Sequence, residues 1–401
     1  MPTKKTAVLL LVIFISALLW VRWVIYRQTL PEITDQGRVT IKGTLLEEPI
    51  EKGNLYFFTL NRTRVYSREN LHYGEVVGLT GTLEKGRLYL PEVKRLGGAS
   101  WLNSNLHRLR LSLKEKINFL FPQPESGLMN GVLLGIKSEL SPGLGEDLKR
   151  NGTIHVAVVS GYNITVVGGL FLALAKFLGR KKALLLSLLA ISFYSLVTGL
   201  GAPTLRAALM ASIAYLGVLS GRVVYPVYSL FLVALVLYFL NPEIIFDIGF
   251  QLSFFATLGI LLFSDRIRKF TKRLPALLKE DLAITLSAQI LVVPIIFYYF
   301  GTVSLVSPLA NALTLWTIPF VTIVGFVVLF ISFIYLPMAS IFALLPLFGL
   351  KFFILVNAFL ASLSFASLSL EKNNLFLLLG YYLSVASLVI FYKTNYVSKK
   401  T

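Results

Sequence analysis

The sequence predicts a mainly α-helical membrane protein, a polytopic bundle of about ten transmembrane helices with a small β-barrel near its N-terminus. Apolar residues make up 56% of the 401 residues and charged residues only 14%, whereas about a quarter of the residues in soluble domains are charged. The mean hydropathy is +0.74. Apolar stretches of about 18 residues, long enough to cross a bilayer, recur along the chain. One polar segment, residues 35–98, alternates like β-strands instead.

The first apolar stretch is predicted to be an N-terminal transmembrane anchor over residues 1–26. Lys4 and Lys5 precede an apolar run over residues 7–26, which contains Arg22 and lacks a small-residue cleavage site. A cleaved signal peptide has a shorter apolar region that ends at such a site. We therefore interpret this stretch as an uncleaved signal anchor.

Residues 35–98 contain short alternating segments that are separated by turn signals such as Lys52-Gly53-Asn54 and Lys85-Gly86. About five short strands in roughly 60 residues suit a Greek-key barrel of the OB type, although an SH3-like barrel would show the same pattern. The aromatic residues of this segment could stack on nucleobases, as in OB folds, or could fill the barrel core. They are Tyr56, Phe57, Phe58, Tyr66, Tyr73 and Tyr89.

Two helical regions follow the predicted barrel. Residues 104–121 combine an apolar stripe with four basic residues, which predicts an amphipathic helix at the membrane interface or a helix packed between barrel and bundle. Residues 125–401 are predicted to form the transmembrane domain. Its predicted spans are 153–175, 183–200, 203–220, 226–241, 246–263, 282–300, 305–334 (long, partly re-entrant), 339–362 and 374–392.

The formal net charge is +18, and its distribution predicts the topology. Positive residues accumulate in cytoplasmic loops of membrane proteins. If the N-terminus is cytoplasmic, the basic loops 176–182 and 264–281 and the basic C-terminal tail all fall on the cytoplasmic side. This arrangement predicts cytoplasmic N- and C-termini and an extracytoplasmic barrel. It also explains most of the excess charge without nucleic acid.

Residue counts limit the chemistry of the chain. There is no cysteine, so disulfides and thiolate metal sites are excluded, and the three histidines are too far apart for a His-rich metal motif. The sequence has no phosphate-binding loop for ATP. We therefore expect no metal and no cofactor, although carboxylate metal sites stay open.

Polar residues inside the apolar spans are the candidate functional residues. Such residues cost a few kcal/mol in a membrane, so they face partners or water. They could form interhelical hydrogen bonds, but polar groups beside broken helices favour a path for a polar substrate. Arg206 and Asp247 are both expected near the outer mouth and could pair. The candidates are His155, Ser160, Asn163, Arg206, Asp247, Gln251, Gln289 and Asn311, with Gly161, Gly199, Gly201 and Gly249 as structural glycines.

Four ordered blocks resemble the ComEC competence-protein family. They are GVLLGIKSELSPGLGEDLKRNGTIHVAVVSGYNITVVGG (131–169), TGLGAPTLRAALMA (198–211), NPEIIFDIGFQLSFFATLGI (241–260) and SAQILVVPIIFYYFGTVSLVSPLANAL (287–313). The resemblance implies a channel, not an enzyme, that carries single-stranded DNA across the cytoplasmic membrane in natural transformation. It implies a DNA-path role for the candidate residues, with Arg206 contacting phosphates.

The chain departs from that family at three points. Ile136 and Asn163 stand where many relatives have an acidic residue and a histidine, and no His-x-His-x-Asp motif of a metallo-β-lactamase-like nuclease domain occurs before the end at Thr401. The expected partners are therefore single-stranded DNA, the lipid bilayer, a separate DNA receptor, a nuclease, a cytoplasmic ATPase and further copies of the chain.

Three alternative functions remain open at this level. The first is a transporter of another polar solute or ion. The second is an intramembrane enzyme that uses Asp247, His155 or Glu280-Asp281 as acid–base groups. The third is a DNA receptor in which the barrel binds and the bundle only anchors.

Overall fold

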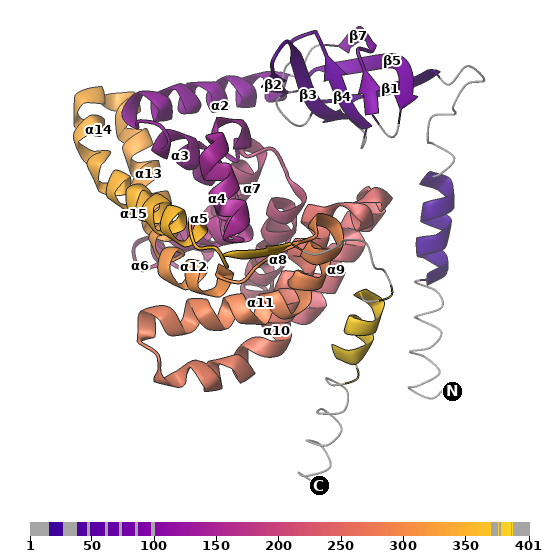
Figure 1. Cartoon of the computed structure of the whole chain (residues 1–401). Coiled ribbons are helices and arrows are strands. Elements are labelled where there is room, and N and C mark those ends of the chain that lie inside the picture. The colour runs from indigo at the N-terminus through magenta and orange to yellow at the C-terminus, as the bar shows by residue number, and fades with distance from the viewer. Residues whose placement is uncertain are drawn as a thin grey trace. The chain divides into compact units, whose positions relative to one another are not determined.

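A computed structural model confirms the predicted fold class, since helices dominate and a small strand-rich segment lies near the N-terminus (Figure 1). The chain divides into two compact units, which are described separately. The first comprises Met1–Lys114, Ser195–Leu200 and Leu235–Ile245, and the second comprises the rest. The structure describes residues 16–26, 38–45, 49–60, 63–71, 74–84, 87–97, 101–369, 376, 378–385 and 387.

Seven strands of the first unit form one sheet with the order β1-β5-β6-β4-β3-β2, and β7 pairs with β5. All ladders are antiparallel except that between β4 and β6. Alternating residues such as Val39, Ile41 and Leu79 are buried and build its core. The strands are β1 (Arg38–Thr44), β2 (Ile50–Lys52), β3 (Leu55–Leu60), β4 (Thr63–Ser67), β5 (Val76–Glu84), β6 (Arg87–Tyr89) and β7 (Glu92–Gly97).

The topology refines the predicted OB-like barrel, because the described sheet does not close. Among the described strands, no ladder joins β1 to β2, so the sheet is an open path, and it contains seven strands rather than five. The long strand β5 pairs with β1, β6 and β7. Because three strands pair with β5, the sheet curves around its core but does not close. Alternation in a sequence reports which face of a strand is buried, but not which strand it pairs with.

A short apolar helix, Ser16–Tyr26, covers the described part of the predicted anchor. Arg22 Nε donates a hydrogen bond to the Phe239 carbonyl at 2.9 Å, and Tyr238 Oη donates to the Leu19 carbonyl at 3.0 Å. These contacts join the helix to the end of α9 within the first unit. Residues 1–15 of the predicted anchor lie outside the described residues.

The remaining helices build the second unit or cross into it. They are α2 (Trp101–Leu120), α3 (Glu125–Leu134), α4 (Pro142–Arg150), α5 (Gly161–Ala173), α6 (Ala175–Leu178), α7 (Arg180–Val197), α8 (Ala202–Leu219), α9 (Pro226–Leu240), α10 (Ile248–Phe270), α11 (Ala276–Phe300), α12 (Ser307–Thr314), α13 (Thr317–Ile334), α14 (Leu336–Phe342) and α15 (Leu344–Ala361), with 3₁₀ turns at Lys137–Glu139, Pro242–Phe246 and Thr271–Arg273.

Six stretches in the described part of the chain are long and apolar enough to cross a membrane, fewer than the ten expected. They are Gly161–Leu178, Ala202–Leu219, Ile248–Arg273, Lys279–Phe300, Thr317–Ile334 and Leu344–Ala361. The expected span 305–334 is divided into α12 and α13, and the expected span 339–362 begins as α14 and continues as α15. The expected span 153–175 begins only at Gly161. Nine of the nineteen residues of the expected span 374–392 lie outside the described residues.

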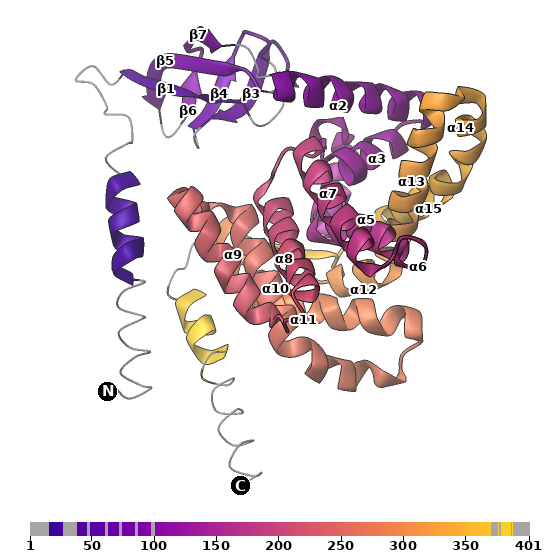
Figure 2. The same ribbon diagram turned by 180° about the vertical axis from the view of Figure 1, so that it is seen from behind.

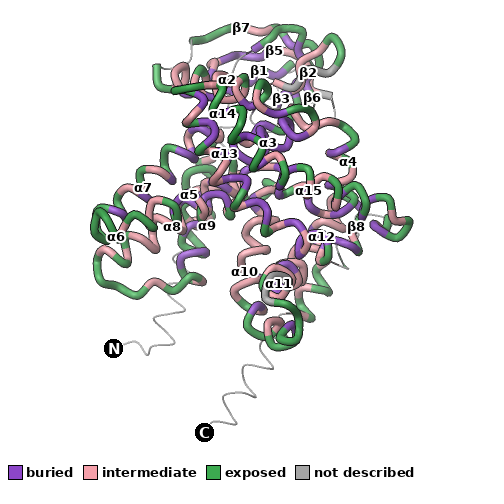
Figure 3. The backbone as a smooth tube through the Cα atoms, turned by 90° about the vertical axis from the view of Figure 1, so that its left-hand side faces the viewer, coloured by how far each residue is buried: buried purple, intermediate pink, exposed green. Residues whose placement is uncertain are grey.

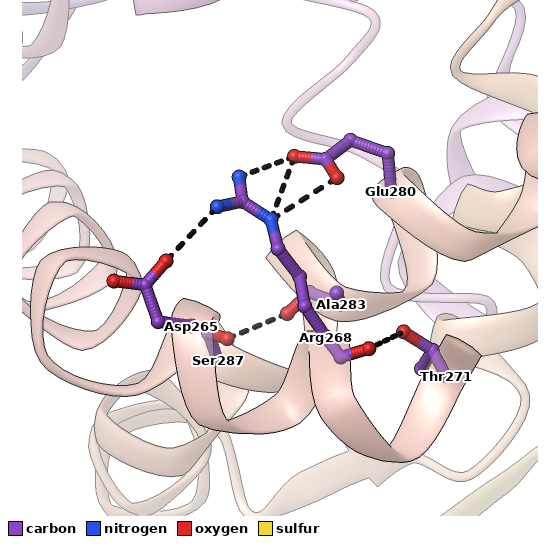
Figure 4. Close-up of polar contacts among 6 residues, drawn as sticks. All are labelled: Asp265, Arg268, Thr271, Glu280, Ala283 and Ser287. Atoms are coloured by element: carbon purple, nitrogen blue, oxygen red, sulfur yellow. Dashed lines mark hydrogen bonds and ion pairs between the residues drawn. The ribbon is translucent and has the colours of Figure 1, made fainter.

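Helices α10 and α11 lie side by side as a long hairpin (Figure 1, Figure 2). Arg268 near the end of α10 contacts both carboxylate oxygens of Glu280 on α11, and its Nη1 donates to Asp265 at 3.1 Å (Figure 4). Further along α11, Ser287 donates to the Ala283 carbonyl. The ion pairs are solvent-exposed, so they orient the hairpin loop more than they stabilise it.

Helix α3 lies inside the second unit, and all ten of its residues are buried (Figure 3). It packs against α13 and α15, where Gly325 receives the side chains of Met129 and Leu133. Two short strands, β8 (Thr302–Ser304) and β9 (Ser367–Ser369), pair antiparallel and join the ends of α11 and α15. Helix α3 is therefore a buried helix that packs against two of the membrane-length helices, α13 and α15.

Candidate functional site

The eight candidate residues lie at several places in the second unit and do not form one cluster. His155 lies in the irregular segment before α5, where it is exposed and its Nδ1 is 3.1 Å from the Gly152 carbonyl oxygen. Ser160 immediately precedes α5, and its carbonyl accepts from the backbone N–H groups of Asn163 and Ile164. The residues expected along one helix thus lie partly before its start.

Two of the candidate amides, Asn163 and Gln289, form hydrogen bonds between helices. Asn163 is 1% exposed, and its Nδ2 donates to the Val132 carbonyl on α3 at 2.7 Å. Gln289 on α11 donates to Ser307 Oγ on α12 at 2.9 Å, and Asn311 donates to the same oxygen at 3.4 Å. These contacts match the alternative interpretation, in which buried polar groups form interhelical hydrogen bonds.

Asp247 has a defined structural role as the N-cap of α10. Its Oδ1 accepts from the Phe250 backbone N–H at 2.6 Å, which satisfies one of the free N–H groups of the first turn. Gln251 lies one turn further along α10 and is half-buried. Gly249 has no side chain here, and a Cβ would lie 3.1 Å from Asp247 Oδ1. The expected pair between Arg206 and Asp247 is not formed among the described residues.

Arg206 on α8 is the candidate whose contacts do not neutralise its charge. It is 8% exposed. Its Nε donates to Ser253 Oγ on α10 at 2.8 Å, and its Nη1 lies 3.3 Å from Met210 Sδ. Among the described residues, no carboxylate forms an ion pair with it. A buried cation without a counter-charge is costly, so it is retained where an anion binds or where the charge itself is needed.

The guanidinium of Arg206 borders a cavity of about 310 Å³ between α5, α8 and α9. Small and apolar side chains make up most of the wall, and the polar contributions come from Arg206, Thr165 and Ser229. Such a mostly apolar site with few polar groups is typical of ligand cavities. The lining residues are Gly161, Thr165, Arg206, Ala207, Met210, Ala211, Ala214, Val224, Pro226 and Ser229.

The N-terminus of α5 lies at the same cavity. Gly161 is its first residue, and a Cβ at this position would lie 3.4 Å from Arg206 Nη2 and 3.1 Å from Ala207 Cβ. Ser160 makes no side-chain cap, so the first N–H groups of the helix keep their partial positive charge. Two positive groups therefore face one cavity, and this arrangement can hold an anion such as a phosphate.

The break between α7 and α8 brings Arg206 to this position. Helix α7 ends at Val197, Gly199 and Leu200 have positive φ angles of 93° and 54°, and α8 begins at Ala202 after Gly201. Pro203 occupies the first turn of α8, where its missing N–H costs nothing. Arg206 then lies one turn inside α8. The glycine–proline segment of the sequence predicts this break.

Several contributing residues were not predicted. Ser253 and Met210 contact Arg206, and a buried group of Asn151, Thr153 and Asn357 joins α15 to the segment after α4. A lone amide in the apolar stretch of α15 is the sequence signal that identifies Asn357. Within the described ranges, no three His, Cys, Asp or Glu residues come close enough to hold a metal ion.

Apolar helices of membrane length around buried polar side chains define a polytopic integral membrane protein with a partly open cavity that Arg206 borders. The chain belongs to the competence-protein family, since the sequence profile described as "Competence protein" matches residues 132–394.

Two curated relatives carry competence names. The chain is 29% identical over 218 residues to "ComE operon protein 3" of Bacillus subtilis (strain 168), which covers 53% of this chain and 27% of that protein. It is 27% identical over 288 residues to "Competence protein ComA" of Neisseria gonorrhoeae, covering 67% of this chain and 39% of that protein.

A third relative, an uncharacterized protein of Aquifex aeolicus (strain VF5), is 36% identical over 114 residues, which cover 28% of this chain and 27% of that protein. The matches thus span well under half the length of all three relatives. No solved structure gives a significant match.

Proposed function

We propose that this protein carries single-stranded DNA across the cytoplasmic membrane during DNA uptake, acting as a channel rather than an enzyme. Family membership supports a role in competence. The observation that carries the DNA-path assignment is Arg206, a buried cation that has no carboxylate partner among the described residues and faces a cavity beside the N-terminus of α5. A phosphodiester supplies the single negative charge that this arrangement accommodates.

The other candidates take supporting roles in this proposal. Ser160 and Gly161 form the helix end beside Arg206, and His155 lies exposed before it. Asp247 and Gln251 begin α10, which carries the Arg206 partner Ser253. Asn163 and Gln289 hold neighbouring helices together through hydrogen bonds, and Asn311 donates within α12 to the serine that Gln289 contacts. The path thus depends on Arg206 for charge and on the amides for shape.

The proposed setting is a cytoplasmic membrane in which both termini are cytoplasmic and the strand segment is extracytoplasmic. A separate DNA receptor would deliver the substrate, a separate nuclease would remove the complementary strand, and a cytoplasmic ATPase would supply energy. Further copies of the chain could complete the path. The basic end of α10 and the turn after it would meet the emerging strand, since they carry Lys269, Lys272 and Arg273.

Uptake of labelled DNA tests the proposal in a host strain that lacks this gene and receives it back in variant forms. Arg206→Ala should abolish uptake while the protein still inserts in the membrane, and Arg206→Lys should restore part of it. Arg222→Ala is the matched control, because Arg222 is exposed in the turn after α8 and is not one of the residues that line the cavity. Normal uptake by Arg206→Ala would refute the DNA-path role of this residue.

A transporter of a small anion is the second candidate, because the cavity is closer in size to one small ligand than to a strand of nucleotides. In that case the deletion strain would take up labelled DNA normally. Purified protein in vesicles would instead release a trapped oxyanion, and Arg206→Ala would stop the release. The two assays therefore separate the candidates.

A further inference from the structure

Helix α11 contains a proline within its apolar stretch. Pro294 lies inside the helix and within Lys279–Phe300, one of the stretches long enough to cross a membrane. In a regular helix, the N–H of residue 294 would donate to the Ile290 carbonyl four residues earlier. Proline has no N–H, so this carbonyl loses its regular donor. Since the centre of a bilayer offers no water to replace the bond, the carbonyl needs a donor from another element.

Two tyrosines from the C-terminal part of the chain supply donors at this point. They belong to a helical segment whose described residues include 378–385. Tyr381 Oη donates to the Ile290 carbonyl at 2.8 Å, and this is the carbonyl that Pro294 leaves without its regular donor. Tyr382 Oη donates to the next carbonyl, that of Leu291, at 2.6 Å. A side-chain hydroxyl from another helix thus replaces the missing bond of α11.

Tyr382 contacts both helices of the α10–α11 hairpin. Its ring centroid is 5.3 Å from that of Phe255 on α10, while its hydroxyl is bonded to Leu291 on α11. One turn further along the hairpin the two backbones touch, since a Cβ on Gly259 would lie 2.4 Å from the Ser287 carbonyl oxygen. The two helices are therefore packed too closely here for one of them to move without the other.

The proline lies near the level at which α10 holds Arg206. The pairs 255–291 and 259–287 fit one antiparallel register, because four residues along α10 match four residues along α11 in the opposite direction. Continued by three residues, this register places Pro294 about level with Leu252, which adjoins Ser253. Ser253 accepts the hydrogen bond from Arg206 Nε. A bend of α11 at Pro294 would therefore act on α10 where it contacts Arg206.

We propose that Pro294 is a hinge of α11 and that the hydroxyls of Tyr381 and Tyr382 form a latch that holds the hinge in one conformation. A helix bends at proline because the bond that would keep it straight is missing. The latch supplies a substitute bond that can be broken, since Tyr381 is 41% exposed and packing does not lock its ring. Release of the latch frees the hairpin to bend and shifts Ser253 relative to Arg206.

A double-mutant cycle on the purified full-length protein tests the latch. Tyr381→Phe keeps the ring and removes the donor, so the midpoint of thermal unfolding in detergent should fall by about 2–4 °C. Pro294→Ala gives residue 294 an N–H that can donate to Ile290. In the Pro294→Ala background, Tyr381→Phe should therefore leave the midpoint unchanged.

Tyr382→Phe is the matched control for this cycle. It removes the same hydroxyl from the adjacent tyrosine, but its acceptor Leu291 is followed four residues later by Ile295, which keeps its N–H. The effect of Tyr382→Phe should therefore be the same with Pro294 and with Pro294→Ala. This difference between two neighbouring tyrosines separates repair of the proline site from a general loss of contacts.

Distances between spin labels measure the hinge itself. The chain has no cysteine, so labels can be attached at Lys272→Cys and Thr302→Cys, two exposed positions on either side of α11. The protein with both tyrosines should give one narrow distance distribution. The double change Tyr381→Phe and Tyr382→Phe should broaden or shift this distribution, and adding Pro294→Ala should restore it.

Two results would overturn the inference. One is an equal loss of midpoint from Tyr381→Phe with Pro294 and with Pro294→Ala, which would mean that the hydroxyl does not replace the missing bond. The other is an unchanged distance distribution in the double phenylalanine variant, which would mean that the tyrosines restrain no hinge. Neither experiment measures DNA uptake, so their outcomes do not depend on the proposed channel.

Discussion

Asn357 shows at the residue scale how one amide organises the helical unit. It is fully buried in the middle of the apolar helix α15. Its Oδ1 accepts from Thr153 Oγ1 at 2.7 Å and from Asn151 Nδ2 at 3.1 Å, and its own Nδ2 donates to the Phe353 carbonyl. Buried polar groups with such reciprocal contacts fix one packing of the surrounding helices.

Removing this amide should destabilise the protein. Asn357→Leu removes the short-range acceptor of Thr153 Oγ1, whereas Asn151 Nδ2 keeps its hydrogen bond to the Asn357 backbone carbonyl at 2.6 Å. A buried group left unsatisfied costs about 1–3 kcal/mol. We expect a lower midpoint in thermal unfolding of the detergent-solubilised protein. Thr153→Val combined with Asn357→Leu should cost less than the two changes added, because both remove the same contact.

The matched control is Ser362→Ala, at an exposed hydroxyl after the same helix. It should leave the midpoint unchanged. An additive double variant would show that Asn357 and Thr153 act independently, against the contacts described here.

The candidate residues were predictable from the sequence, but the partners that they contact were only partly so. A lone arginine in an apolar span signals a special environment, so Arg206 was predicted as a candidate. Its partner Ser253 was not predicted, because the hydroxyl of a serine in a helix most often forms a hydrogen bond with the backbone of its own helix. Asn163 was predicted to line a path, and its amide is bonded to Val132 instead. Hydropathy identifies unusual residues but not their partners.

Among the elements of the structure, helix α3 and the segment before α5 lie in close contact. A Cβ on Gly131 would lie 2.1 Å from the Ala157 carbonyl oxygen, so the two backbones are in contact there. This position requires glycine because a backbone atom, unlike the end of a flexible side chain, cannot move away cheaply. The contact holds α3 against the residues that lead to the cavity.

Gly131→Ala should therefore reduce the amount of folded protein in the membrane, measured by gel filtration of a fluorescent fusion. Gly169→Ala is the control within α5, since a Cβ there meets nothing within 4 Å. It should be neutral or slightly stabilising, because alanine has the higher helix propensity. Equal yields from both variants would contradict the close approach.

Helix breaks were predictable where glycine and proline mark them. The segment before α8 contains both, and its break agrees with the prediction. The break between α12 and α13 falls at Leu315-Trp316, where the sequence stays apolar and nothing stops a hydropathy window. Tertiary packing decides such breaks, so the expected span 305–334 was too long. The same reason applies between α14 and α15.

The topology of the whole molecule is directly testable because the chain has no cysteine. Single cysteines can be introduced at exposed positions in the strand segment (Arg68→Cys), in the α10–α11 loop (Lys272→Cys) and after α11 (Thr302→Cys). A maleimide that cannot cross membranes should label Arg68→Cys and Thr302→Cys in intact cells. Lys272→Cys should react only after permeabilisation.

The unsubstituted protein, which offers no thiol, is the labelling control. Reaction of Lys272→Cys in intact cells together with protection of Arg68→Cys would invert the proposed orientation. Labelling of Lys272→Cys and Thr302→Cys on the same side would mean that α10 and α11 do not both cross the membrane as proposed.

The fixed positive charge at Arg206 has a consequence for the energised membrane. A channel wide enough for a polymer risks leaking protons and metal ions, which would dissipate the proton-motive force. A guanidinium and a helix N-terminus facing the same cavity raise the electrostatic barrier to every small cation. The charge that would attract a phosphate would then also limit the leakage of cations. Cells that make this protein would keep their membrane potential when no DNA occupies the channel.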